Sequence, residues 1–261
     1  MARRFFFTVI NELLIIALFV VIVVTFIGPV EKNIKADGRG YYEYLPSFFI
    51  YHDLIRKDIP VKTDSVFNKR VISIPSYIDY RDYKVDKFAC GTAVLELPFF
   101  LTALAVTDLE GNNTDGYQKP FHTAIFIAAL FYLFLALVFL KKILELYGID
   151  HYIIIFIQLL LVLATGVTNY AYFDAGFSHG YSLFAISAFI YFIKLYFIHL
   201  RFSDFYVACL FAGLILILRQ VNVIIILILP FIAESWPVLK EGALRLIKNP
   251  VKLIVGFLII A

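Results

Sequence analysis

The sequence predicts an all-α fold, a polytopic transmembrane helical bundle with about six to seven spans and an extracytoplasmic first loop that carries juxtamembrane helices. Composition and pattern both indicate this class. Hydrophobic residues make up 62% of the 261 residues and charged residues only 16%, whereas about a quarter of a soluble domain is charged. The apolar residues also form long runs, several near the roughly 20 residues that cross a bilayer.

The first apolar run covers about residues 5–29 and follows Arg3 and Arg4. Basic flanking residues stay in the cytoplasm, so this run predicts a retained helix with a cytoplasmic N-terminus. The other expected spans lie at about residues 121–140, 152–168, 181–198, 203–218 and 221–233. A last apolar segment begins at Pro250 and is about half as long as a crossing requires. We therefore expect residues 1–261 to be a single transmembrane domain, an N-terminal fragment whose C-terminal part is missing.

If the N-terminus is cytoplasmic, counting the membrane crossings along the chain places the basic residues on the inner side of the membrane and the polar clusters on the outer side. Residues 31–119, 169–180 and 219–222 are expected outside, and the short loop 169–180 contains no Lys or Arg. That composition agrees with the positive-inside rule. The basic residues expected inside are Lys141, Lys142, Arg201, Lys240, Arg245 and Lys248.

The long outer segment is expected to contain membrane-surface elements. Pro46 predicts a helix start, with Arg56 and Lys57 in the last turn. Residues 58–86 are rich in polar residues and predict a solvent-exposed connection. Residues 88–106 are apolar and could form a further full crossing, but Glu96-Leu97-Pro98 interrupts their middle, and a crossing would break the charge pattern downstream. We therefore expect a re-entrant or interfacial element there.

Several function classes lack their usual signals. The net charge is only +3, and no basic stripe marks a nucleic-acid partner. The two cysteines, Cys90 and Cys209, do not suggest a disulfide framework. The sequence has no Gly-rich phosphate loop and no HExxH, paired CxxC or GxSxG motif. Residues 112–114 match a glycosylation acceptor, but matches of three residues are common by chance.

Asp37 is the first candidate for chemistry, in the stretch ADGRGYYEYLPS behind the first apolar run. Gly38 and Gly40 on either side of Arg39 predict a tight backbone path. One interpretation is a turn aspartate in a solvated loop. The other is a general base or metal ligand at the mouth of a membrane cavity, with Glu43 as a second carboxylate. For Glu43 a surface position is the expected alternative.

Ser178 and His179 form a second candidate site at the outer start of a span, in DAGFSHGYS. A histidine at that depth is often an interfacial side chain with its polar end in water. Asp174 is close by in sequence, and the serine, histidine and aspartate side chains together also suit binding of a polar headgroup.

The stretch Arg219-Gln220-Val221-Asn222 separates two short apolar runs. It predicts either a hairpin turn whose arginine reaches to the interface or a cation fixed in the outer leaflet. A fixed guanidinium there can bind an anionic phosphate. Both interpretations stay open.

Four segments together resemble the GT-C superfamily of integral membrane glycosyltransferases, especially bacterial family 39-like proteins of the Bacteroidetes type. They are KADGRGYYEYLPSFFIYHD, VDKFACGTAVLELPFFLTALAV, GFSHGYSLF and RQVN. The resemblance implies a multi-pass enzyme of the bacterial inner (cytoplasmic) membrane, surrounded by membrane lipids. It would move a sugar from a polyprenyl-phosphate donor, a lipid-linked sugar, to an extracytoplasmic acceptor of the cell envelope.

In this superfamily an acidic residue of the first outer loop, matched here by Asp37, serves the acceptor hydroxyl or a divalent cation such as Mg²⁺ or Mn²⁺. The sequence lacks the usual adjacent acidic pair, which leaves the metal requirement open. Sugar transfer needs a base for the hydroxyl and a cation for the departing phosphate. Asp37 is the expected base. The expected substrate-binding residues are Glu43, Lys87, Ser178, His179, Arg219 and Asn222, with Arg39 as a further helper.

Two other classes remain. A transporter or flippase of a lipid-linked or polar substrate would line a path with ionisable groups inside its helices. The expected helix interiors offer little beyond Gln158, Thr165 and Lys194, and the polar clusters gather at one face, which disfavours transport. A non-catalytic membrane scaffold would tolerate the substitution Asp37→Asn, and an enzyme would not.

Overall fold

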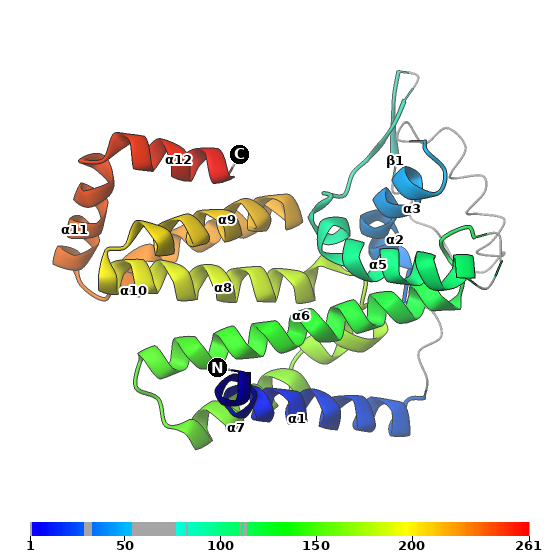
Figure 1. The fold of residues 1–261 in the computed structure, drawn as a ribbon, viewed down its shortest axis with the longest axis horizontal. Coiled ribbons are helices and arrows are strands. Elements are labelled where there is room, and N and C mark those ends of the chain that lie inside the picture. The colour runs from blue at the N-terminus through cyan, green and yellow to red at the C-terminus, as the bar shows by residue number, and fades with distance from the viewer. Residues whose placement is uncertain are drawn as a thin grey trace. The chain divides into compact units, whose positions relative to one another are not determined.

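The structure is a computed structural model, and it describes residues 2–28, 33–53, 77–81, 83–109, 111 and 114–260. This part of the chain is mainly helical (Figure 1), which confirms the all-α class. Its elements are α1 (Ala2–Phe26), α2 (Ala36–Tyr42), α3 (Tyr44–Phe49), β1 (Tyr77–Tyr80), β2 (Tyr83–Asp86), α5 (Gly91–Leu109), α6 (Lys119–Leu146), α7 (His151–Leu163), the π-helix η1 (Asn169–Phe173), α8 (Ser178–His199), α9 (Phe202–Leu218), the 3₁₀ helix η2 (Gln220–Ile228), α10 (Leu229–Ala233), α11 (Trp236–Ile247) and α12 (Pro250–Ile260).

The chain divides into two compact units. Unit 1 comprises Met1–Glu12, Phe134–Gln158 and Ser182–Ala261. Unit 2 comprises Leu13–Leu133 and Leu159–Tyr181. Because the divisions fall within α1, α6, α7 and α8, these four helices contribute residues to both units.

Among the described residues, four helical segments are long and apolar enough to cross a membrane. They are Val9–Phe26 within α1, and the helices α5, α6 and α8. A fifth span results if Gln220–Ala233 and Trp236–Ile247, which bend by 120° at their junction, count as one. Helices α7, α9 and α12 are apolar but shorter. Such helices are consistent with a multi-pass membrane protein, although fewer reach full length than the about six to seven expected.

Unit 2 has an aromatic core that joins α2 and α3 to α5 and α6. The ring centroid of Tyr42 lies 5.8 Å from that of Phe100 and 5.5 Å from that of Tyr117. The ring of Phe121 lies 5.2 Å from Phe100, and Ile34 is buried in the same cluster. Aromatic pairs at such distances add stability beyond their buried area, so α2 and α3 are fixed against α5.

Unit 1 contains a close helix pair and a buried polar group. A Cβ at Gly213 of α9 would lie 2.9 Å from the carbonyl oxygen of Ile260 in α12, an approach that small residues permit between membrane helices. The carboxylate of Glu12 lies 3.7 Å from Lys141 Nζ and accepts a hydrogen bond from Gln158 Nε2 at 3.1 Å. The helix interiors therefore hold more ionisable groups than the sequence suggested.

Helix α5 runs unbroken through Pro98, so the interruption predicted at Glu96-Leu97-Pro98 is wrong. Proline removes one backbone donor and displaces a carbonyl of the preceding turn. In that turn the hydroxyl of Tyr132 donates to the carbonyl of Leu95 at 2.9 Å. A neighbouring helix thus supplies a donor beside the proline, as is common in membrane helices.

Two other local predictions differ from the structure. Helix α3 ends at Phe49, earlier than expected, and the predicted last-turn Arg56 and Lys57 lie outside the described residues. Within the segment expected to be a plain connection, β1 and β2 form an antiparallel hairpin with Tyr77 opposite Asp86. Its residues 58–76, and the asparagines 112 and 113 of the glycosylation pattern, also lie outside the described part of the chain.

Candidate functional site

Asp37 lies in the first turn of the short helix α2 and is partly exposed. The prediction that Asp37 lies in a loop turn is therefore wrong, because its backbone is helical. A carboxylate in a first helical turn is favoured by the helix dipole, which explains why α2 accepts one here. Ala36, directly before it, has a φ of 46°, a left-handed conformation that costs a residue with a Cβ about 1–2 kcal/mol.

Gly38 and Gly40 do not make a tight turn, because both lie within the helical backbone of α2. Their use is close packing. A Cβ at Gly38 would lie 3.1 Å from the backbone carbon of Gly176 and 3.2 Å from the ring of Phe177. A Cβ at Gly40 would lie 2.1 Å from the ring of Phe88. The missing side chain of Gly38 therefore lets α2 approach the entrance of α8, and that of Gly40 lets α2 approach the segment before α5.

A partly exposed ion pair joins the residue before α2 to the segment that leads into α8. Lys35 Nζ lies 3.4 Å from Asp174 Oδ1, and the side-chain amide of Asn169 donates to Asp174 Oδ2 at 2.7 Å. Asn169 begins the π-helix η1, a rare conformation that is frequent at functional sites. Two polar segments more than 130 residues apart in sequence are thus brought together within unit 2.

Ser178 and His179 begin α8 at this contact. Ser178 is fully buried, and its hydroxyl has no hydrogen-bond partner among the described residues. The imidazole of His179 stacks on Tyr170 with centroids 4.0 Å apart and ring planes 4° apart. The first-turn N–H groups of a helix lack intrahelical partners and favour anions, so the start of α8 suits a phosphate.

Glu43 is fully buried, unlike the surface position expected as its alternative. Its Oε1 lies 2.5 Å from Nε of Arg39, one turn earlier along the chain. The two predicted helpers therefore neutralise each other inside unit 2. Lys87 is exposed, with its Nζ 5.0 Å from the ring centroid of Phe88, the ring that covers Gly40.

Arg219 and Asn222 belong to unit 1 and make their own contacts there. Arg219 follows the last residue of α9 with an extended backbone, and Asn222 lies in the 3₁₀ helix η2. The side-chain amide of Asn222 donates to the hydroxyl of Ser182 at 3.0 Å. Of the predicted site residues, unit 2 holds Asp37, Glu43, Lys87, Ser178 and His179.

Glu96 is a residue that the sequence analysis did not assign to a site. It is fully buried in α5, and one carboxylate oxygen accepts a hydrogen bond from the hydroxyl of Tyr181 at 3.0 Å. Its other oxygen, and the buried hydroxyl of Thr92 one turn earlier, have no hydrogen-bond partner in the described part of the chain. Tyr181 follows Ser178 by one turn of α8. The sequence feature that could have indicated Glu96 is a carboxylate inside an apolar run. Ionisable residues within membrane helices are rare and usually belong to functional sites.

The described side chains include no group of three or more His, Cys, Asp or Glu arranged to hold a metal ion. Asp37 and Glu43, the two carboxylates considered for a divalent cation, do not form such a group, since Arg39 engages Glu43. In the described part of the chain, Asp37 and Glu43 therefore form no preassembled site for Mg²⁺ or Mn²⁺.

No family model, curated protein or solved structure matches the chain.

Proposed function

We propose that this chain is a membrane glycosyltransferase, which moves a sugar from a polyprenyl-phosphate donor to an extracytoplasmic acceptor. The observation that carries the proposal is the contact between α2 and the entrance of α8, where Gly38 abuts Gly176 and Lys35 pairs with Asp174. This contact combines a partly exposed carboxylate with a helix N-terminus in one part of unit 2. A base and an anion-binding group are the two components that the reaction requires.

Each residue then has a defined role. Asp37 accepts the proton of the acceptor hydroxyl as its oxygen forms a bond to the anomeric carbon of the sugar. The bond from that carbon to the phosphate oxygen breaks, and polyprenyl phosphate leaves with the electron pair. His179 and the first-turn N–H groups of α8 stabilise the phosphate. Within unit 2, Lys87 is the further candidate for a contact to the phosphate or the sugar.

The directions of α1 and α6 support an external position for this site. Glu12, early in α1, contacts Lys141, late in α6. After α1, the backbone N–H of Asn33 donates to His122 Nδ1 at 3.0 Å, in the first turn of α6. The two helices thus run in opposite directions, which requires an even number of crossings between them. Residues 54–76 contain no long apolar run that could supply a second crossing, so the proposed topology keeps α5 on the outer side, although its length and composition would allow it to cross.

Sugar transfer by the full-length protein tests the proposal. Membranes carrying the protein are supplied with radiolabelled polyprenyl-phosphate sugars, and the labelled product is measured. We expect transfer by the wild type and loss of transfer in Asp37→Asn. The matched control is Asp108→Asn, which removes an exposed carboxylate at the end of α5 and should retain transfer. Absence of transfer from every donor tested with the wild type would contradict the proposal.

A transporter or flippase is the second candidate, because Glu12, Lys141 and Gln158 form a buried polar group within helices. Buried ionisable groups of this kind mark ion and substrate paths in membrane proteins. A transporter would move an unmodified polyprenyl-phosphate sugar across proteoliposomes, and Glu12→Gln would stop the movement. An enzyme would form a new product, and Asp37→Asn would stop its formation.

A further inference from the structure

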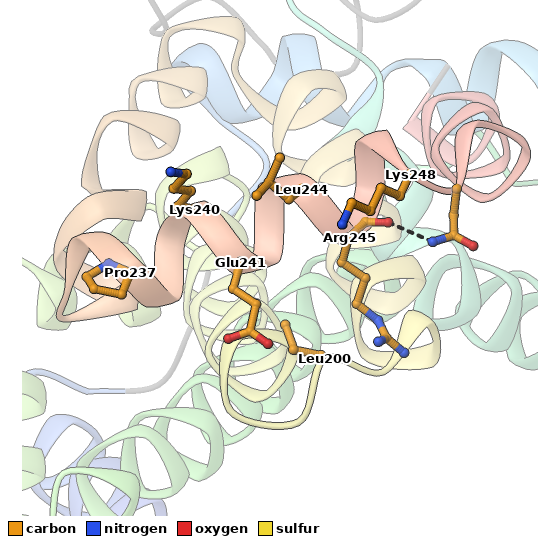
Figure 2. Close-up of a pocket in the computed structure, with 8 residues that line it drawn as sticks. Leu200, Pro237, Lys240, Glu241, Leu244, Arg245 and Lys248 are labelled. Carbon is orange, nitrogen blue, oxygen red and sulfur yellow. Dashed lines mark hydrogen bonds between the residues drawn. The ribbon is translucent and has the colours of Figure 1, made fainter.

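A pocket of about 470 Å³ lies beside α11 in unit 1 (Figure 2). Its lining includes three cations, Lys240, Arg245 and Lys248, and one carboxylate, Glu241. Figure 2 shows Lys240 and Leu244 on one side of α11 and Glu241 and Arg245 on the other. The excess of positive charge favours an anionic ligand.

The position of α11 indicates where that ligand would come from. Of the residues of α11, all of them described, only Gly242 is buried. Its carbonyl accepts a hydrogen bond from the hydroxyl of Tyr196 at 2.7 Å, and a Cβ on it would lie 2.9 Å from the ring of Phe197. Both aromatic residues belong to the last turn of α8, a candidate membrane span. Helix α11 therefore packs against the end of a span, at the level where lipid headgroups lie.

The remaining surface of α11 is both apolar and basic. Trp236 is 74% exposed, Ile247 65% and Leu244 40%. The guanidinium of Arg245 lies 5.2 Å from the ring centroid of Phe202, and Lys252 Nζ lies 4.1 Å from the same centroid. The chain also bends by 120° between η2–α10 and α11. Exposed apolar residues with basic neighbours are typical of a helix in the plane of the membrane interface.

We propose that the pocket beside α11 binds the headgroup phosphate of an anionic phospholipid. Arg245 and Lys248, which lie three residues apart, would donate hydrogen bonds to the phosphate oxygens, and Lys240 on the other side of α11 (Figure 2) would add to the positive field of the pocket. The acyl chains would lie along Leu244 and Ile247. This proposal does not rest on the proposed sugar transfer, because none of the residues that line the pocket is assigned a role in that reaction. Basic clusters on amphipathic helices recognise anionic lipids in this way.

The single tryptophan of the chain, Trp236, begins α11 and makes a direct test possible. The purified full chain in detergent micelles is titrated with brominated phosphatidylglycerol or brominated phosphatidylcholine, and quenching of the Trp236 fluorescence is measured. We expect quenching at lower concentrations of the anionic lipid. The double variant Arg245→Gln/Lys248→Gln removes two cations, and each removed cation should weaken phosphatidylglycerol binding about fivefold. The expected loss of affinity is therefore about 25-fold.

Two matched variants serve as controls. Lys119→Gln/Lys142→Gln removes the same charge from α6 and should keep the lipid preference. Arg245→Lys/Lys248→Arg keeps the charge of the pocket and should also keep the preference for the anionic lipid. If it does, the weaker binding of Arg245→Gln/Lys248→Gln comes from the lost charge and not from a folding defect. Equal quenching by both lipids, or an unchanged preference in Arg245→Gln/Lys248→Gln, would overturn the proposal. Reversal of the phosphatidylglycerol quenching by inorganic phosphate would also overturn it, because the pocket would then take free phosphate.

Discussion

At the scale of single residues, Asp37 is held next to a strained backbone position. Ala36 has a left-handed φ of 46°, and such strain persists only where the surrounding structure fixes it. Here Lys35 pairs with Asp174 on one side of Ala36, and Gly38 abuts Gly176 on the other. The strain is therefore a sign that the position of Asp37 is determined by its neighbours.

Replacing Ala36 by glycine tests this interpretation. Glycine removes the left-handed strain, about 1–2 kcal/mol, but loses about 0.5–1 kcal/mol through the greater freedom of the unfolded chain. We expect Ala36→Gly to raise the free energy of unfolding by about 0.5–1 kcal/mol, and Ala36→Val to lower it. Denaturant unfolding of the detergent-solubilised protein measures both. A lower stability of Ala36→Gly would show that Ala36 is not strained.

At the scale of elements, the contact between α2 and its neighbours was not predictable from the sequence. A glycine serves equally for a tight turn and for close packing, because both need a missing Cβ. The partners that decide between these uses, Phe88 for Gly40 and Gly176 for Gly38, are distant in sequence. For the same reason Pro98 falsely predicted a break in α5. The hydroxyl of Tyr132, which bonds in the turn before Pro98, comes from α6.

A substitution at Gly40 measures the packing of α2. The added Cβ of Gly40→Ala would lie 2.1 Å from the ring of Phe88, so we expect a loss of about 1–3 kcal/mol of unfolding free energy. In the background of Phe88→Ala the same change should cost much less, since the ring is gone. The comparison of the four proteins forms a double-mutant cycle. Equal costs in both backgrounds would contradict the contact.

The aromatic core behind α2 predicts a dependence of stability on pH. Burial raises the pKa of the Tyr42 hydroxyl, and nearby carboxylates add to this, while burial likewise raises the pKa of Tyr117. In the unfolded chain tyrosine loses its proton near pH 10. Above that pH the unfolded state therefore binds fewer protons than the folded state, and stability falls.

We thus expect full stability of this core below about pH 10 and a progressive loss as the pH rises further. The unfolding midpoint in denaturant, measured at several pH values between neutral and strongly alkaline, records this loss. Tyr117→Phe removes one titrating group and should make the decline shallower. A decline of equal slope in Tyr117→Phe and the wild type would show that Tyr117 does not contribute.

At the scale of the whole molecule, composition was sufficient to predict the class, because so much apolar surface requires a membrane. The number of spans was harder to predict. An apolar run in the sequence indicates a buried helix, but it does not show at which residue the backbone hydrogen bonds of that helix end. Residues 152–168 were expected as one span, yet α7 ends at Leu163, and the π-helix η1 follows soon after.

The sidedness of the chain can be tested with its native cysteines. Cys90 is exposed and Cys209 is buried, and the proposed topology places Cys90 outside. We expect a membrane-impermeant maleimide to label intact cells at Cys90 and to give no label in Cys90→Ser. Cys209 should react only after denaturation. Labelling of Cys90 that requires permeabilised cells would contradict an external position of residues 31–119.

We propose above that Asp37 acts as the base in sugar transfer. The most direct measurement compares donor binding with single-turnover transfer for the purified wild type and Asp37→Asn. We expect Asp37→Asn to bind the polyprenyl-phosphate sugar as tightly as the wild type but to transfer the sugar at least about 100-fold more slowly, since a general base usually contributes a factor of that size or more. Equal transfer rates for the two proteins would contradict the claim.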